Sequence, residues 1–233
     1  MRKPKYPGKS VLFMTIQSSI LTNLFKYNLV KNKITLLTEM LDYSNWLEAN
    51  FGKIRIENSR EMNWSKISKS LVGDKFQGIE FGVAWGYLTW WWFKNCSSLI
   101  GSWHGFDRFT GLPRAWRNFA KGTFDTGGAV PNITDNRITW YVGDIESKVD
   151  ELKIDTTRSY PLIVFFDLDI FEPSLFAWEK IKSSLRSGDI LYFDEAFDTD
   201  ERKLLNENVL PSGDFEFVSA SWLSLAIKVK QIY

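Results

Sequence analysis

From Phe76 onward, the chain alternates short apolar runs with longer segments of helical periodicity. The apolar runs are continuous and do not alternate with polar residues, which is typical of parallel strands covered on both faces. The expected strands are Gly78–Phe81, Leu99–Phe106, Ile138–Val142, Leu162–Phe166 and Ile190–Phe193. The expected helices between them are Tyr87–Asn95, Ile145–Leu152 and Pro173–Leu185. This alternation predicts a doubly wound, mostly parallel, Rossmann-like α/β sheet.

Two further apolar stretches close the chain, Phe215–Ala220 and Leu223–Lys230, and only Ser221 and Trp222 separate them. The pattern predicts an antiparallel hairpin at the edge of the sheet. A mostly parallel sheet that ends in such a hairpin resembles the class I methyltransferase fold, whereas nicotinamide-binding Rossmann domains usually lack it.

The first 75 residues follow a different pattern, made of pieces with helical periodicity. One apolar stripe combines Phe13, Ile16, Ile20 and Leu24, with Leu21 and Phe25 beside it. Two more helical stretches are expected around Leu37–Phe51 and Trp64–Leu71. We therefore expect an N-terminal helical extension or lid over residues 1–75, followed by an α/β domain over residues 76–233. The stripe can face the domain core, a second subunit of a homo-oligomer, or a membrane surface.

Composition narrows the class of protein. The chain has 233 residues, of which 44% are hydrophobic and 24% charged, as in ordinary globular domains. Its net charge of +1 provides no strong field to recruit nucleic acid or an anionic membrane. Polar residues interrupt the apolar start of the chain, so we expect neither a signal peptide nor a transmembrane segment.

Cysteine and histidine each occur once, as Cys96 and His104. A single thiol cannot form an internal disulfide, so a reducing cytoplasm is the expected location. A single histidine excludes a histidine-rich zinc site. We interpret Cys96 as a buried, inert thiol and His104, inside an expected strand, as structural.

The first expected strand leads into a turn, Glu80–Gly86, in which Gly82 and Gly86 have Gly-x-x-x-Gly spacing. These glycines permit a tight turn and a close approach of the backbone to a ligand at the next helix N-terminus. The spacing is not the Gly-x-Gly-x-x-Gly of dinucleotide-binding domains, which argues against a nicotinamide oxidoreductase. Glu80 would repel a pyrophosphate and tolerate a cationic methionine moiety.

Acidic residues also follow the second and third expected strands. Asp107 can accept hydrogen bonds from both hydroxyls of a ribose. It can equally stabilise a turn or cap a helix, and the sequence leaves both interpretations open. Gly143 and Asp144 follow the third strand and are candidates for contact with an adenine edge.

The fourth and fifth expected strands end in Asp167-Leu168-Asp169 and Asp194-Glu195. Two like charges about 4 Å apart repel by roughly 4 kcal/mol at an effective dielectric constant near 20. Such a group therefore needs a cation or raised pKa values. An all-oxygen site suits a hard ion such as Mg2+ or Ca2+. The alternative is that some of these acids cap the next helix or pair with Arg or Lys.

Taken together and in order, four segments resemble the macrocin O-methyltransferase family. The segments are Glu80–Gly86, Gly105–Pro113, Phe166–Ser174 and Ser187–Glu195. Members of this family are bacterial, metal-dependent methyltransferases best known for methylating sugar hydroxyls of natural products. The resemblance spans roughly Phe76 to Asn208, and Trp116–Gly128 is similar to an insertion carried by some members.

The resemblance implies a set of site residues. S-adenosylmethionine would be bound by Glu80, Phe81, Gly82, Gly86, Thr89, Asp107, Gly143, Asp144 and Asp167. Mg2+ or another hard divalent cation would be bound by Asp167, Asp194 and Glu195, and Asp169 would be the catalytic base. Arg108 departs from the small hydroxyl residue common in the family, and Glu195 from its second aspartate. Ile170 stands where catechol-type enzymes carry a lysine base, so their mechanism does not transfer.

The sequence thus predicts a cytoplasmic, S-adenosylmethionine- and Mg2+-dependent O-methyltransferase acting on a small-molecule or sugar hydroxyl, with its methyltransferase domain at residues 76–233. One alternative is an N-methyltransferase or a nucleic-acid methyltransferase. No Asn/Asp-Pro-Pro-aromatic motif follows the fourth strand, which disfavours both. The other alternative is a non-catalytic binding protein that keeps the fold. Of the run Trp90–Trp92, we expect two side chains in the core and one at the cofactor or an interface.

Overall fold

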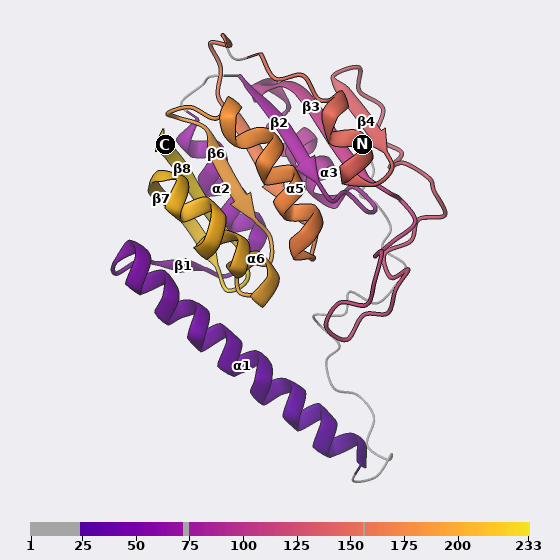
Figure 1. Cartoon of the computed structure of the whole chain (residues 1–233), viewed down its shortest axis with the longest axis vertical. Coiled ribbons are helices and arrows are strands. Elements are labelled where there is room, and N and C mark those ends of the chain that lie inside the picture. Colours follow the sequence, from indigo (N-terminus) through magenta and orange to yellow (C-terminus); the bar gives the residue numbers. More distant parts are fainter. Residues whose placement is uncertain (1–23, 72–74, 156) are drawn as a thin grey trace. The chain divides into compact units, whose positions relative to one another are not determined.

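The structure is a computed structural model that describes residues 24–71, 75–155 and 157–233 (Figure 1). The chain divides into two compact units between Ile54 and Arg55. The described element of the first unit is α1 (Leu24–Phe51), which contains the expected helix at Leu37–Phe51. Most of the apolar stripe expected from Phe13 onward lies outside the described residues. None of the described helices combines the length and apolarity needed to span a lipid bilayer.

The second unit, Arg55–Tyr233, is built on a mixed sheet with the strand order β1-β7-β8-β6-β5-β2-β3-β4. Its strands are β1 (Ile56–Glu57), β2 (Phe76–Phe81), β3 (Ile100–Asp107), β4 (Ile138–Val142), β5 (Leu162–Phe166), β6 (Ile190–Phe193), β7 (Gly213–Ser221) and β8 (Leu225–Ile232). β8 is antiparallel to both of its neighbours, and the other pairs are parallel. The predicted doubly wound sheet with a C-terminal hairpin is confirmed.

Helices cover both faces of this sheet. They are α2 (Arg60–Ser70), α3 (Tyr87–Asn95), α4 (Ile145–Lys148), α5 (Phe171–Ile181) and α6 (Thr199–Leu204). α5 and α6 lie on the near face in Figure 1. Residues of α2 and α3 share one apolar core with strand residues that include Trp103, Phe165 and Tyr192. This aromatic core holds the strands in place, so their carboxyl ends form a defined edge.

Within the tryptophan run, Trp90 and Trp92 are buried and Trp91 is half-buried against Trp64. Cys96 is a buried free thiol, and burial raises its pKa, which agrees with an inert role. His104 is half-buried 3.2 Å from the Tyr141 hydroxyl, and burial lowers its pKa. The surroundings of these residues therefore agree with roles in packing.

Every expected strand is present, and its ends differ from the prediction by at most two residues. The helices differ more. The segment expected as one helix at Ile145–Leu152 is α4 followed by a 3-10 turn at Val149–Glu151. α2 begins four residues before the expected Trp64, because Ser59 caps it by accepting a hydrogen bond from the Met62 amide. β1 has only two residues and carries no detectable sequence pattern.

Candidate active site

A glycine turn follows β2 at the carboxyl edge of the sheet. Gly82 has φ +89°, and a Cβ at this position would lie 1.7 Å from the Asp167 carbonyl oxygen. Gly86 has φ +73° and is the N-cap residue of α3. Only glycine fits such a close approach at a positive φ. The turn therefore presses directly against the end of β5, as a ligand-binding loop in this fold requires.

Asp107 at the end of β3 holds this turn in place. Its Oδ2 accepts hydrogen bonds from the amides of Val83 at 2.8 Å and Ala84 at 2.7 Å. Its Oδ1 accepts one from the Phe109 amide at 2.6 Å. The turn-stabilising role that the sequence left open is therefore present in the structure. Contact with a ribose stays a prediction.

Three other predicted donor-binding residues lie beneath the turn. Glu80, Phe81 and Thr89 are all buried. Glu80 Oε2 accepts hydrogen bonds from the Thr89 hydroxyl and, at 2.8 Å, from the Trp103 indole N–H. Burial raises the pKa of Glu80 from its usual 4.5 to about 8. The hydrogen bond between Glu80 in β2 and Thr89 in α3 joins the two elements on either side of the turn. Contact of either residue with a ligand stays a prediction.

Gly143 and Asp144 lie after β4, beside Asp107. The Gly143 amide donates to the Asp107 carbonyl oxygen at 3.0 Å. Asp144 pairs with Arg108, with 3.0 Å between Oδ1 and Nε. Arg108, the residue that departs from the family pattern, thus engages the predicted adenine-edge residue at the surface.

The ends of β5 and β6 bring together the three predicted cation ligands. Phe166 and Phe193 are paired in parallel register, so Asp167 and Asp194, the residues that follow them, become neighbours. One carboxylate oxygen from each of Asp167, Asp194 and Glu195 lies within 4.8 Å of the other two. Asp194 is buried, and its Oδ1 accepts a hydrogen bond from the Tyr192 hydroxyl at 2.6 Å.

Two more carboxyl groups complete what we call the acidic cluster, defined as Asp167, Asp169, Asp194, Glu195 and Glu201. Asp169 is 9% exposed and has φ +62°, a strained conformation for a non-glycine residue. Glu201, on α6, is 1% exposed, and its Oε2 accepts a hydrogen bond from the Glu195 amide at 3.0 Å. Sequence analysis did not identify Glu201, since only the turn after β6 brings it to this edge.

Burial and the charge of Asp194 raise the pKa values of the other four carboxyl groups in this cluster. For Asp167, Glu195 and Glu201, burial is the largest cause and the charge of Asp194 the next, and each pKa is well above its usual value. The pKa of Asp169 is raised to about 8 by burial and by Asp194 and Asp198. These groups cannot all be ionised unless positive charge is placed among them.

Arg60, the first residue of α2, supplies one such charge. Its Nη1 lies 2.7 Å from Asp194 Oδ2, and its Nη2 lies 3.7 Å from Glu195 Oε1. Sequence analysis missed this residue, because nothing in the local pattern connects Arg60 with the ends of β5 and β6. The sequence left open that some of these acids pair with Arg or Lys, and this is the case for Asp194 and Glu195.

The cluster nevertheless fits a divalent cation. Two of its buried carboxylate oxygens, Glu195 Oε2 and Glu201 Oε1, have no hydrogen-bond partner within the described part of the chain, and Asp194 Oδ2 has only its ion pair with Arg60. Buried oxygens normally have partners, so these atoms mark a place for a ligand. Ligand oxygens around Mg2+ lie about 2.0–2.1 Å from the ion and those around Ca2+ about 2.3–2.6 Å, which a set within 4.8 Å can approach.

The insertion predicted at Trp116–Gly128 lies beside the cluster. Arg117 pairs with Asp198, and Arg114 pairs with Glu172 at 2.8 Å. Trp116 packs in a small apolar group with Leu112 and Ile170, and Ile170 directly follows Asp169. The insertion is therefore fastened to the segments that carry the acids.

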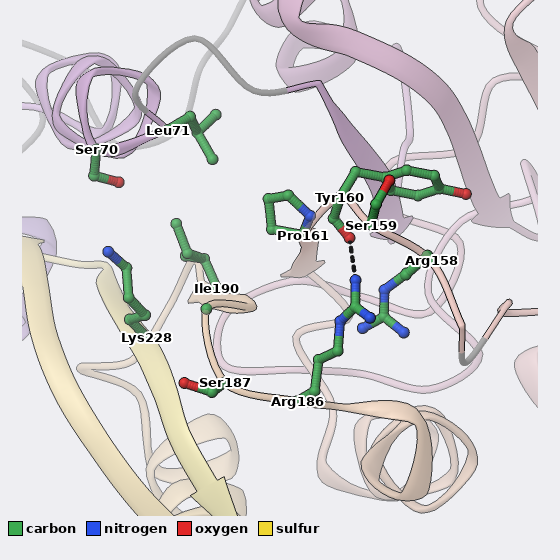
Figure 2. Close-up of a pocket in the computed structure, with 11 residues that line it drawn as sticks. Ser70, Leu71, Arg158, Ser159, Tyr160, Pro161, Arg186, Ser187, Ile190 and Lys228 are labelled. Carbon is green, nitrogen blue, oxygen red and sulfur yellow. Dashed lines mark hydrogen bonds between the residues drawn. The ribbon is translucent and has the colours of Figure 1, made fainter.

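A cavity of about 510 Å³ lies elsewhere, near the amino ends of β5 and β6 (Figure 2). Arg158, Tyr160, Arg186 and Lys228 are among its lining residues, and Arg186 Nη2 donates to the Tyr160 carbonyl oxygen at 2.9 Å. It contains none of the predicted site residues. We place the candidate site at the carboxyl edge, where the glycine turn and the acids meet.

Comparisons with known proteins address the fold. No protein-family description and no curated sequence matches the chain. Among solved structures, the calicheamicin methyltransferase CalS11 has a TM-score of 0.56 at 18% identity, covering 72% of this chain and 78% of that one. Its apo structure, described as a TDP-rhamnose 3'-O-methyltransferase, has a TM-score of 0.53 at 18% identity over the same shares. The O-methyltransferase NovP has a TM-score of 0.53 at 13% identity, covering 74% of this chain and 80% of that one. The chain therefore has the class I methyltransferase fold that its strand pattern and its family resemblance predict.

Proposed function

We propose that this protein is an S-adenosylmethionine-dependent O-methyltransferase that acts on a hydroxyl group of a small molecule with the help of a divalent cation. One observation carries the proposal: a glycine turn of the donor-binding type lies in contact with Asp167, a member of a buried acidic cluster. The fold, shared with proteins named as O-methyltransferases, supports it.

S-adenosylmethionine would supply the methyl group from its sulfonium centre and leave as S-adenosylhomocysteine. The turn Gly82–Gly86 would bind it, with Asp107 fixing the turn and Gly143 and Asp144 beside the adenine. The buried Glu80 holds the turn from below through Thr89. In this division of roles the backbone positions the donor, which is the main requirement of a methyl transfer.

Mg2+, held by Asp167, Asp194 and Glu195, would lower the pKa of the acceptor hydroxyl. Asp169 is the proposed base, since it lies two residues after Asp167 on the loop that follows β5 and could accept the proton that the hydroxyl loses. The insertion, held by the Arg117–Asp198 ion pair and by the packing of Trp116 against Ile170, would cover the site and limit the access of water.

The proposed acceptor is a sugar or another small hydroxyl compound, supported by the fold shared with CalS11, which is described as a TDP-rhamnose 3'-O-methyltransferase. The proposed location is the cytoplasm, in keeping with the single cysteine. A second candidate, a non-catalytic binding protein, is favoured by one observation. Arg60 already pairs with two acids of the cluster, as expected of a site that has lost its cation.

The deciding experiment is calorimetric titration of S-adenosylhomocysteine in the presence of Mg2+, followed by methyl transfer from labelled donor to a panel of sugars and catechols. Micromolar binding and transfer to a hydroxyl are expected. D167A should lose Mg2+-dependent turnover and remain folded. The control D150A, which removes an exposed carboxylate paired with Lys180, should keep full activity. Donor binding without transfer to any acceptor would favour the binding protein, and full activity of D167A would refute the cation site.

A further inference from the structure

Arg60 holds a position that a divalent cation would need. Its guanidinium lies 2.7 Å from Asp194 Oδ2 and 3.7 Å from Glu195 Oε1. Asp194 and Glu195 are also two of the three predicted cation ligands. A single guanidinium charge cannot balance the five carboxyl groups of the acidic cluster, so the site keeps a demand for positive charge while Arg60 is bound.

We infer that Arg60 and a divalent cation are alternative counter-ions of Asp194 and Glu195, so that binding of the cation displaces the Arg60 guanidinium. The inference rests on the proposed function, because it takes the acidic cluster as the cation site. A Mg2+ ligated by Asp194 Oδ2 would lie about 2.0–2.1 Å from that oxygen. Arg60 Nη1 lies 2.7 Å from the same oxygen, so two positive charges would face the same carboxylates at close range.

The contact between Arg60 and Asp194 has features that would allow the guanidinium to leave. Although it is short, its geometry is not that of a hydrogen bond, because Asp194 Oδ2 has no hydrogen-bond donor in the described part of the chain. The Arg60 side chain is 31% exposed, so part of it already contacts solvent. The ion pair therefore lacks the geometry of a hydrogen bond, so its displacement by a divalent cation would break no directed bond to Asp194 Oδ2.

The backbone of α2 around Arg60 is held by contacts that do not involve the Arg60 side chain. The Ser59 hydroxyl caps the helix, and Tyr87 donates a hydrogen bond to Glu61 at 2.8 Å. One turn later, Asn63 donates to the Ser224 hydroxyl at 2.9 Å. These contacts fix the backbone on both sides of Arg60. Rotation of the Arg60 side chain alone would then free Asp194 and Glu195. The guanidinium would compete with the cation for these two carboxylates each time the cation binds.

Two consequences follow from competition for one site. Removal of the Arg60 charge should tighten cation binding, since the cation no longer has to displace a guanidinium. The same substitution should destabilise the cation-free protein, because buried carboxylates lose their counter-ion. Arg60 is a positioning residue in this account and touches neither donor nor acceptor.

The test is calorimetric titration of Mg2+ alone into the wild type, R60Q, R60K and R114Q. R60Q is expected to bind Mg2+ about tenfold more tightly than the wild type, within the usual range of coupling between two ligands. R60K keeps the charge and should stay near the wild type. R114Q is the matched control, because Arg114 pairs with Glu172 at the same edge and outside the cluster. Thermal unfolding adds a second readout: R60Q should unfold at a lower temperature without Mg2+, and saturating Mg2+ should close that difference.

Equal or weaker binding of Mg2+ by R60Q would overturn the inference, because it would mean that Arg60 and the cation bind side by side. If R60Q folds only when Mg2+ is added, that rescue supports it. Failure of the wild type and of R60Q to bind Mg2+ would overturn the inference together with the cation site. The methyltransferase proposal would then still be decided separately, by the titration with S-adenosylhomocysteine.

Discussion

Glu80 offers a test of the site through its pKa, with the substitution E80Q. Glu80 is buried, and its Oε2 accepts hydrogen bonds from Thr89 and Trp103. Burial raises its pKa from 4.5 to about 8, so the carboxyl is protonated in the folded protein at neutral pH. Glutamine has the same shape, and its carbonyl oxygen can accept both hydrogen bonds. E80Q therefore removes the titration and keeps the contacts.

The sign follows from proton linkage. The pKa of Glu80 is higher in the folded than in the unfolded chain, so its contribution to stability is complete below pH 4.5 and is lost as pH rises toward 8. The loss is about 1.4 kcal/mol for each pH unit within that window. At pH 7 it amounts to about 3 kcal/mol, which E80Q does not incur. E80Q should therefore match the wild type near pH 5 and become progressively more stable than it toward pH 8.

Urea unfolding of both proteins at pH 5, 6, 7 and 8 measures this difference directly. Taking the difference removes the part of the acidic cluster's contribution that does not depend on Glu80, whose charge also raises the pKa of Asp167. E216Q is the control, because Glu216 is exposed and its pKa is lowered by Lys230. It should show no gain in stability with rising pH. A difference between E80Q and the wild type that stays constant from pH 5 to pH 8 would refute the assignment of a protonated Glu80.

Three substitutions test the rest of the site. G82A should destabilise the protein by roughly 3 kcal/mol or more, since a Cβ there would meet the Asp167 carbonyl oxygen at 1.7 Å and φ is positive, and urea unfolding measures the loss. D169N should lower kcat at least about 100-fold with an unchanged Kd for S-adenosylhomocysteine, because Asn tolerates φ +62° but cannot take a proton; an unchanged kcat would exclude Asp169 as the base. E201A should weaken Mg2+ binding by about 10-fold or more, since Glu201 holds the Glu195 amide at 3.0 Å, and calorimetry decides.

The strands could be predicted because burial on both faces leaves a continuous apolar run, as at Leu162–Phe166, where every residue is buried. The acids Asp167 and Asp194 could be predicted as neighbours for a related reason: parallel strands place their carboxyl ends at one edge. The local sequence pattern was thus enough to predict the fold and those site residues that directly follow the strands.

Arg60 and Glu201 could not be predicted, because their positions depend on tertiary contacts. Arg60 reaches the cluster only since α2 is fixed on the sheet by Asn63 and Ser224. Glu201 reaches it only through the turn between β6 and α6, where it binds the Glu195 amide. Asp107 is an intermediate case. Its place at the end of β3 was predictable, and its choice of the Val83 and Ala84 amides required the structure.

The turn proposed to bind the donor and Asp167, proposed to bind the cation, are in direct contact, and this contact would couple the two sites. The Gly82 amide donates to the Phe106 carbonyl oxygen at 2.9 Å, and the Asp167 amide donates to the Phe81 carbonyl oxygen at 2.8 Å. The turn that would bind the donor continues directly from the end of β2, and Asp167 is bonded to that same strand end, with no room for a Cβ between Gly82 and Asp167. A ligand that moves Gly82 must also move Asp167. If binding of the donor changes the affinity for the cation, binding of the cation must change the affinity for the donor by the same factor. Gly82 would then have two roles: it permits the positive φ of the turn, and it allows the close contact with Asp167 that couples the two sites.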